Sequence, residues 1–147
     1  VNALPAITGL SVQEVVHDGG LRRLLTASMR EAVRIGLRSK VRFEPLQGLG
    51  RRGLRLFSVL PLWIGQVLPA LMSRRMGSVP NPGSTLQSIR RGQATEIDYL
   101  NGAVVRVAEA IGRTAPVNAL MVELVHEVEA SGAFIAPADV LARAARG

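Results

Sequence analysis

Apolar residues recur at three- and four-residue spacing along most of the chain, which is the pattern of amphipathic helices. The segment 18–37 shows this spacing most clearly, and Asp18 stands where it can cap the helix. Strand-type alternation is nearly absent, so the pattern predicts an all-α fold. The other predicted helices cover residues 11–17, 84–91, 95–110, 117–130 and 137–146.

The middle of the chain is apolar but broken by proline. Residues 56–72 carry no charge, and Pro61 and Pro69 interrupt them. A membrane span needs about 20 apolar residues. We therefore predict that residues 54–76 form a kinked helical hairpin that covers apolar surface and is itself buried or covered by a partner, such as a second subunit. A helix on a membrane surface is the weaker alternative. Two segments rich in proline and glycine are predicted as loops: 40–53 and 79–84.

The head of the predicted helix 95–110 places a carboxylate among apolar positions. Each helical residue advances about 100° around the axis, so Glu96 falls in line with Leu100 and Val104 and is predicted to face inward. Thr95 and Asp98 fit a capping box, and Ser84 with Gln87 fits another. Glu96 is then either an anion favoured by the helix dipole or part of a site.

The amino-acid composition excludes several classes of protein for this chain. The length of 147 residues suits one domain, and 48% hydrophobic residues exclude a disordered chain. Without cysteine there are no disulfides or zinc–thiolate sites, and a cytoplasmic location is expected. The net charge of +7 divides into +8 over residues 1–80 and −1 over 81–147, which favours an anionic partner. Aromatic content of 3% and the lack of a DNA-binding motif argue against nucleic acid.

Three features that could indicate other functions do not. Residues 48–53 match G-x-G-x-x-G, but no strand precedes them and no acidic residue follows at about 20 positions, so the dinucleotide fingerprint is rejected. His17 and His126 lack metal-ligand spacing and are predicted as surface or capping residues, so no metal site is expected. The chain begins at Val1 without a basic and then apolar stretch, and no signal peptide is predicted.

A long gapped pattern resembles a known family. The stretch GSTLQSIRRGQATEIDYLNG, followed by a helix and PVN, is similar to the C-terminal domain of ketopantoate reductases (2-dehydropantoate 2-reductases), whose pattern is close to S-M-x-Q-D-I-x-x-G-R-x-T-E-I-D-Y-I-N-G and then P-x-N. NALPAITG likewise resembles the family's N-P-L-T-A-L-x-G and aligns Asn2 with a substrate-site asparagine. The resemblance covers residues 1–38 and 83–130. The matched positions are Ser84, Gln87, Ile89, Gly92, Thr95, Glu96, Ile97, Asp98, Tyr99, Asn101, Gly102, Pro116 and Asn118.

The resemblance implies a fold, a reaction and roles for three residues. The fold is the multi-helical type of the 6-phosphogluconate dehydrogenase C-terminal domain, over residues 1–147. NADPH lies on an N-terminal Rossmann domain, and a lysine upstream of Val1 is the general acid in reducing ketopantoate to pantoate. Glu96 is catalytic through that lysine, and Asn2 and Ser84 bind substrate. On this view Glu96 faces inward because the head of its helix borders the substrate cleft.

Some positions depart from the family pattern and keep alternatives open. Ser88 and Gln93 replace an aspartate and a basic residue, residues 40–80 look like an insertion, and Lys40 cannot be the catalytic lysine. The chain alone is therefore expected to be inactive. The expected partners are a 2-oxoacid substrate and the Rossmann domain of the same protein. A homodimer is an alternative that stays open, and binding to a membrane is not expected. The alternatives are a reductase of another 2-oxoacid or a helical interaction module.

Overall fold

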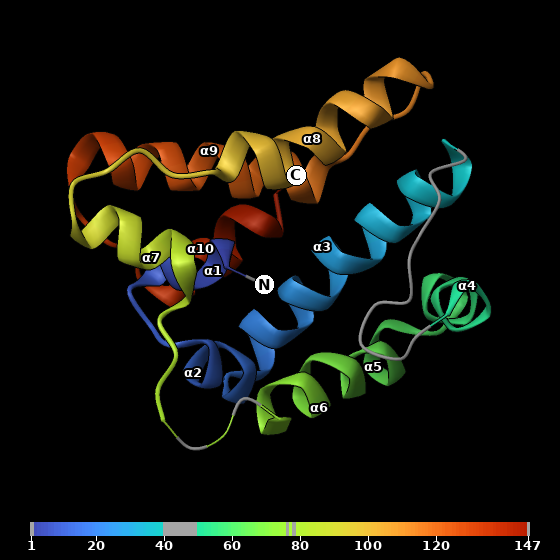
Figure 1. The fold of residues 1–147 in the computed structure, drawn as a ribbon, viewed down its shortest axis with the longest axis horizontal. Coiled ribbons are helices and arrows are strands. Elements are labelled where there is room, and N and C mark those ends of the chain that lie inside the picture. The colour runs from blue at the N-terminus through green and yellow to red at the C-terminus, as the bar shows by residue number, and fades with distance from the viewer. Residues whose placement is uncertain (1, 40–49, 76, 78, 147) are drawn as a thin grey trace.

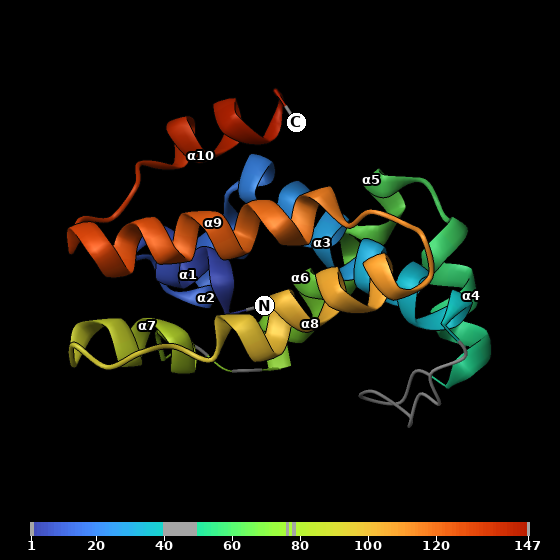
Figure 2. The same ribbon diagram turned by 90° about the horizontal axis from the view of Figure 1, so that it is seen from above.

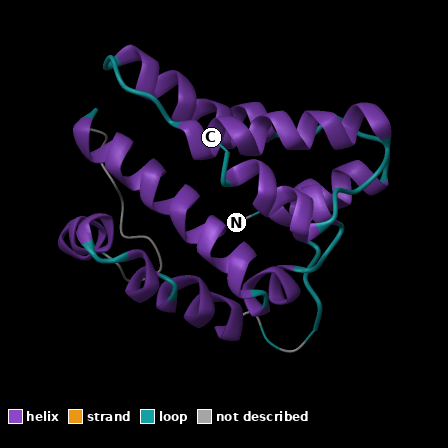
Figure 3. Ribbon diagram, turned by 180° about the vertical axis from the view of Figure 1, so that it is seen from behind, coloured by secondary structure: helices purple, strands orange, loops and turns teal. Residues whose placement is uncertain are grey.

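The computed structural model describes residues 2–39, 50–75, 77 and 79–146. Over these residues the regular structure is entirely helical (Figure 3), so the predicted all-α fold is confirmed. The helices are α1 Ala3–Thr8, α2 Val12–His17, α3 Gly19–Arg38, α4 Arg51–Val59, α5 Leu62–Gly65, α6 Val67–Arg75, α7 Gly83–Arg90, α8 Ile97–Ala110, α9 Pro116–Ser131 and α10 Pro137–Ala144.

Local side-chain hydrogen bonds explain where several helices begin and end. Asp18 Oδ1 accepts a hydrogen bond from the backbone N–H of Leu21 at 2.8 Å, which confirms its predicted capping role at α3. Ser11 and Glu14 form a reciprocal capping box at α2. Gly132 ends α9 in the left-handed conformation at φ 70°, which glycine adopts without strain. α1 was not predicted; it is as short as α2 but lacks the side-chain capping bond that marks the start of α2.

The long helix α3 lies at the centre of the arrangement, and α8 and α9 form an antiparallel pair beside it (Figures 1 and 2). α9 also packs against the short α1, which in turn lies against α7. The main core forms where α1, α2, α3 and α9 meet, and α10 adds a side chain to it. Its fully buried side chains include Leu4, Ile7, Val15, Leu21, Leu124, Val128 and Val140.

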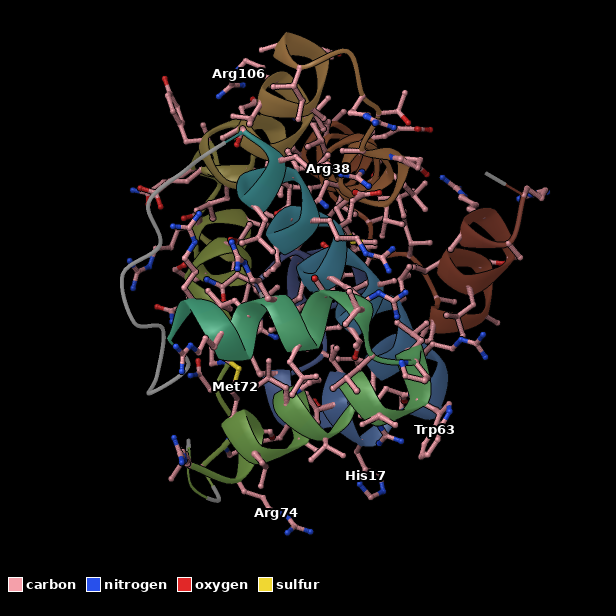
Figure 4. The ribbon with its side chains drawn as sticks, turned by 90° about the vertical axis from the view of Figure 1, so that its right-hand side faces the viewer. His17, Arg38, Trp63, Met72, Arg74 and Arg106 are labelled. Carbon is pink, nitrogen blue, oxygen red and sulfur yellow. The ribbon has the colours of Figure 1, made fainter. Side chains whose placement is uncertain are left out.

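The segment after residue 50 forms a kinked hairpin that packs on α3 and α2, as predicted (Figure 4). Pro61 separates α4 from α5. Pro69 does not break α6, because it lies in the first turn, where a backbone N–H has no partner within the helix. α4 already begins at Arg51, inside the predicted loop, and residues 40–49 of that loop lie outside the described residues.

The outer side of this hairpin is exposed within this chain, and the predicted cover by a partner stays a prediction. Trp63 is 72% exposed, whereas Phe57, on α4, is 5% exposed and faces α5 and α3. The hairpin covers apolar surface with one face and leaves another apolar face in solvent. The exposed apolar residues are Leu56, Val59, Trp63, Val67 and Leu71. Across the part of the chain that is described, no helix combines the length and apolarity needed to cross a bilayer.

Helix α8 is rotated relative to the prediction. Its buried residues are Ile97, Gly102 and Ala108, while Glu96 is exposed and Leu100 is 46% exposed. Glu96 therefore does not face the core of this chain, and its place at a substrate cleft stays a prediction. The row that begins with Glu96 and Leu100 stays partly open to solvent, although α9 and α3 both pack against α8.

Candidate functional site

Asn2 and Ser84 are 82 positions apart in sequence and meet in the structure. Asn2 precedes α1, Ser84 stands in the first turn of α7, and the two helices lie side by side (Figure 1). Asn2 Nδ2 donates a hydrogen bond to Ser84 Oγ at 3.0 Å. The capping box predicted for Ser84 and Gln87 is wrong, because α7 already begins at Gly83 and Ser84 accepts from Asn2.

The backbone at Gly83 allows this close approach. Gly83 has φ +73°, and a β-carbon added there would lie 3.1 Å from Asn2 Oδ1. A larger residue would strain the backbone and displace the asparagine. The preceding turn is fixed by Asn81, whose Oδ1 accepts from Gly83 N at 2.9 Å and whose carbonyl accepts from Val12 N at 2.8 Å. The Asn2–Ser84 pair therefore sits on a constrained turn.

Glu96 occupies the N-cap position of α8. Its carbonyl accepts from the N–H groups of Tyr99 and Leu100, each at 3.0 Å, but its side chain makes no capping bond. Thr95 Oγ1 accepts from Ile97 N at 3.3 Å instead. Among the described residues, no hydrogen bond or ion pair engages the Glu96 carboxylate. A charged group at this position is free to meet a ligand or a second domain.

The capping box predicted from Thr95 and Asp98 does not form. The Asp98 carboxylate turns toward α9 and contacts His126, at 3.1 Å between Oδ1 and Nε2. Seen from above, the N-terminal end of the chain, α7 and the start of α8 all lie on the same side of α9 (Figure 2). The three residues predicted for the site thus come from segments on one side of the molecule, and two of them are in direct contact.

A buried polar cluster lies between α8, α9 and α3 and fixes these helices relative to one another. Asn118 is 2% exposed, and its Oδ1 accepts from Asn101 Nδ2 at 2.9 Å. The Glu31 carboxylate accepts from Val117 N at 3.1 Å and from Asn118 N at 2.8 Å, and so satisfies the first turn of α9. Sequence analysis missed Glu31, because no local pattern reports a cap that lies 86 residues away.

Arg30, Arg34 and Arg38 of α3 line a hollow of about 330 Å³. The residues predicted for the site do not line it. Arg30 Nη1 donates to the carbonyl of Leu60 at 2.7 Å, and Arg34 Nε donates to that of Ser58 at 2.8 Å. Burial, and to a lesser degree the charge of Arg34, lowers the pKa of Arg30 below its usual range. These donors satisfy carbonyls at the end of α4, so we assign the two arginines a structural role.

Within the described ranges, no group of three or more histidine, aspartate or glutamate side chains is arranged to hold a metal ion. The side chains at the candidate site are an amide, a hydroxyl and a carboxylate. They can orient a polar substrate by hydrogen bonding and attract a cationic group, but they include no hydride carrier. The arrangement therefore suits a substrate-binding and positioning function.

The fold is found in a structure of an enzyme that uses a nicotinamide cofactor. The chain is similar to the ternary structure of D-mandelate dehydrogenase with NADH and anilino(oxo)acetate, with a TM-score of 0.66, 21% sequence identity and coverage of 88% of this chain and 62% of that one. At this identity the likeness shows the fold alone.

Sequence comparison identifies the family. The family described as "Ketopantoate reductase PanE/ApbA C terminal" matches residues 1–129, and the chain belongs to it. The chain is 46% identical over 50 residues to a 2-dehydropantoate 2-reductase of Pyrococcus abyssi. It is 41% identical over 49 residues to one of Archaeoglobus fulgidus. These matches span 34% and 33% of this chain and 17% of each relative.

Proposed function

We propose that the chain is the substrate-binding domain of an NADPH-dependent reductase that converts 2-dehydropantoate to pantoate. The observation that carries the proposal is the contact between Asn2 and Ser84, on the same side of the molecule as an uncommitted Glu96. Family membership over residues 1–129 supports it. The likeness to a dehydrogenase solved with NADH agrees with a nicotinamide cofactor.

Each of the three site residues, Asn2, Ser84 and Glu96, has a defined part in the proposed reaction. The Asn2 amide and the Ser84 hydroxyl, 3.0 Å apart, offer both donors and acceptors to the polar groups of the substrate. The Glu96 carboxylate holds the ammonium of a lysine and the substrate hydroxyl. That lysine protonates the ketone oxygen as hydride reaches the carbonyl carbon. NADPH supplies the hydride, held mainly by a Rossmann domain outside this chain.

A reductase of another 2-oxoacid is the second candidate. The observation that favours it is the segment 40–80, which we propose to be a family-atypical insertion and whose described part forms α4, α5 and α6. A different set of helices near the substrate would change which side chain of a 2-oxoacid is accepted. Comparing kcat/KM for 2-dehydropantoate with that for other 2-oxoacids separates the two reactions.

The 147-residue chain by itself is expected to show no NADPH-dependent reduction of 2-dehydropantoate. The sequence has one lysine, Lys40, which does not match the catalytic position. Its G-x-G-x-x-G pattern at 48–53 is not followed by an acidic residue about 20 positions on, as a dinucleotide site requires. The measurement is NADPH oxidation by the purified chain against a buffer control. Turnover above that control would show that the chain holds its own hydride-donor site and general acid.

Replacing Ser84 with alanine is expected to raise KM about 3- to 10-fold in the complete reductase. The change removes the Ser84 hydroxyl, which is a hydrogen-bonding partner of the substrate and of Asn2. A hydrogen bond of this kind contributes about 0.5–1.5 kcal/mol. Steady-state kinetics measures the effect, with Ser73→Ala on α6 as the matched control. Equal KM values for the two variants would remove Ser84 from the substrate site.

A further inference from the structure

His126, on α9, has a carboxylate at each of its two ring nitrogens. Nδ1 lies 2.7 Å from Glu129 Oε2 on the same helix, and Nε2 lies 3.1 Å from Asp98 Oδ1 in the first turn of α8. The histidine side chain is 46% exposed, so solvent reaches it. The proposed reaction assigns no role to this cluster.

The same cluster reaches the residues on both sides of Glu96. Glu129 Oε1 accepts the backbone N–H of Thr95 at 2.9 Å, directly before Glu96. Asp98 follows Glu96 by two positions. We propose that His126 is a positioning residue. By linking Glu129 to Asp98, it holds the turn around Glu96 in place against α9, and so fixes where the Glu96 side chain points. Its importance for turnover rests on the function proposed above for Glu96.

The chemistry of imidazole sets the condition under which this link forms. A carboxylate accepts hydrogen bonds, and a neutral histidine has only one ring N–H to donate. Two carboxylates are satisfied together only when both nitrogens of His126 carry protons. In agreement, the hydrogen bond to Glu129, and next that to Asp98, raises the pKa of His126 above its usual 6.5.

Besides His126, the charged groups near the cluster are the carboxylates of Asp98 and Glu129 and the guanidinium of Arg106. On α8, Arg106 flanks Gly102 from the side that Asp98 also reaches, since a β-carbon at Gly102 would lie 3.4 Å from Arg106 Nη1 and 3.5 Å from Asp98 Oδ1. α1 contributes no charged residue, and Glu31 of α3 serves the opposite end of α9. The remaining charged groups on α9 and α10 gather around Arg143: Glu123, Glu127 and Asp139.

The raised pKa gives the direction of the pH effect. A group whose pKa is higher in the folded state contributes stability that is fully present below its unfolded value, here 6.5. That contribution is lost as the pH rises through the folded value. The turn around Glu96 should therefore be held most firmly in mildly acidic solution and should loosen as His126 loses its proton.

The test is an NMR titration of the 147-residue chain. We expect the His126 ring to titrate above 6.5, and the amide signals of Thr95 and Glu96 to shift with the same midpoint. In His126→Phe this shift should vanish, and the Thr95 amide should exchange with solvent about tenfold faster. In His126→Arg, whose guanidinium stays charged and offers several donors, slow exchange should persist without a titration.

The control is His17→Phe, which alters the other histidine of the chain, an exposed residue on α2 (Figure 4). This variant should leave the Thr95 and Glu96 signals unchanged. Asp98→Asn should lower the pKa of His126, because it removes one of the two carboxylates. If the Thr95 and Glu96 amide signals stay unchanged both when His126 titrates and in His126→Phe, the proposal is wrong.

Kinetics of the complete reductase separates this proposal from the assignment of Glu96. We expect His126→Phe to lower kcat about 3- to 10-fold with little change in KM. His126→Arg should keep kcat near that of the unchanged enzyme, and the part of the pH profile that follows the titration of His126 should disappear. Normal turnover in Glu96→Gln would overturn the role proposed for Glu96, while the NMR result still decides whether His126 positions the turn. Normal turnover in His126→Phe beside an impaired Glu96→Gln would overturn the positioning role in catalysis.

Discussion

Replacing Glu96 with glutamine in the complete reductase is expected to lower kcat/KM by about 30- to 1000-fold. The carboxylate is free of partners among the described residues, so in the proposed site it serves the lysine ammonium and the substrate hydroxyl. Losing a charge-assisted contact of roughly 2–4 kcal/mol in the transition state gives a decrease of this size. Steady-state kinetics on the purified variant measures it.

The same substitution should change stability little. At an exposed N-cap, the attraction between a carboxylate and the helix dipole contributes about 0.3–1 kcal/mol. Thermal unfolding of the variant provides this second measurement, and Glu109→Gln, an exposed change near the end of α8, is the matched control for turnover. Near-normal turnover with a lowered melting temperature would mean that Glu96 only stabilises the start of its helix.

Replacing Phe57 with alanine is expected to reduce the free energy of unfolding by about 3–5 kcal/mol. Phe57 is 5% exposed, and its ring lies against Gly65, where an added β-carbon would be 3.4 Å from Phe57 Cε2. Removing the ring leaves a cavity between α4, α5 and α3. Chemical denaturation of the 147-residue chain measures the loss.

Trp63→Ala is the contrasting variant on the same hairpin. Trp63 is 72% exposed, so its replacement should alter the free energy of unfolding by no more than about 0.5 kcal/mol. Size-exclusion chromatography should then give the same oligomeric state for both proteins. A large, concentration-dependent loss of stability in Trp63→Ala would show instead that a second copy covers this face in solution.

The sequence by itself determined the fold class and most of the helices, because these depend on local information. Helical spacing and the cap at Asp18 placed α3 to within one residue at each end, and the turn at Gly132 placed the end of α9. Proline chemistry predicted the break at Pro61. The family pattern selected Asn2, Ser84 and Glu96, and the structure brings the first two into contact.

Only the tertiary structure decided what the side chains near the site do. Local pattern gave Ser84 and Thr95 the role of helix caps, but Asn2 approaches Ser84 from another segment and donates to it. Thr95 Oγ1 does accept from Ile97 N, but its backbone N–H donates to Glu129 and not to Asp98. Likewise Asp98 contacts His126, 28 positions away, instead of its own helix start. A local signal reports what a residue can do within one helical turn. It does not report which distant group will compete for the same hydrogen bond or which face a neighbouring helix will cover.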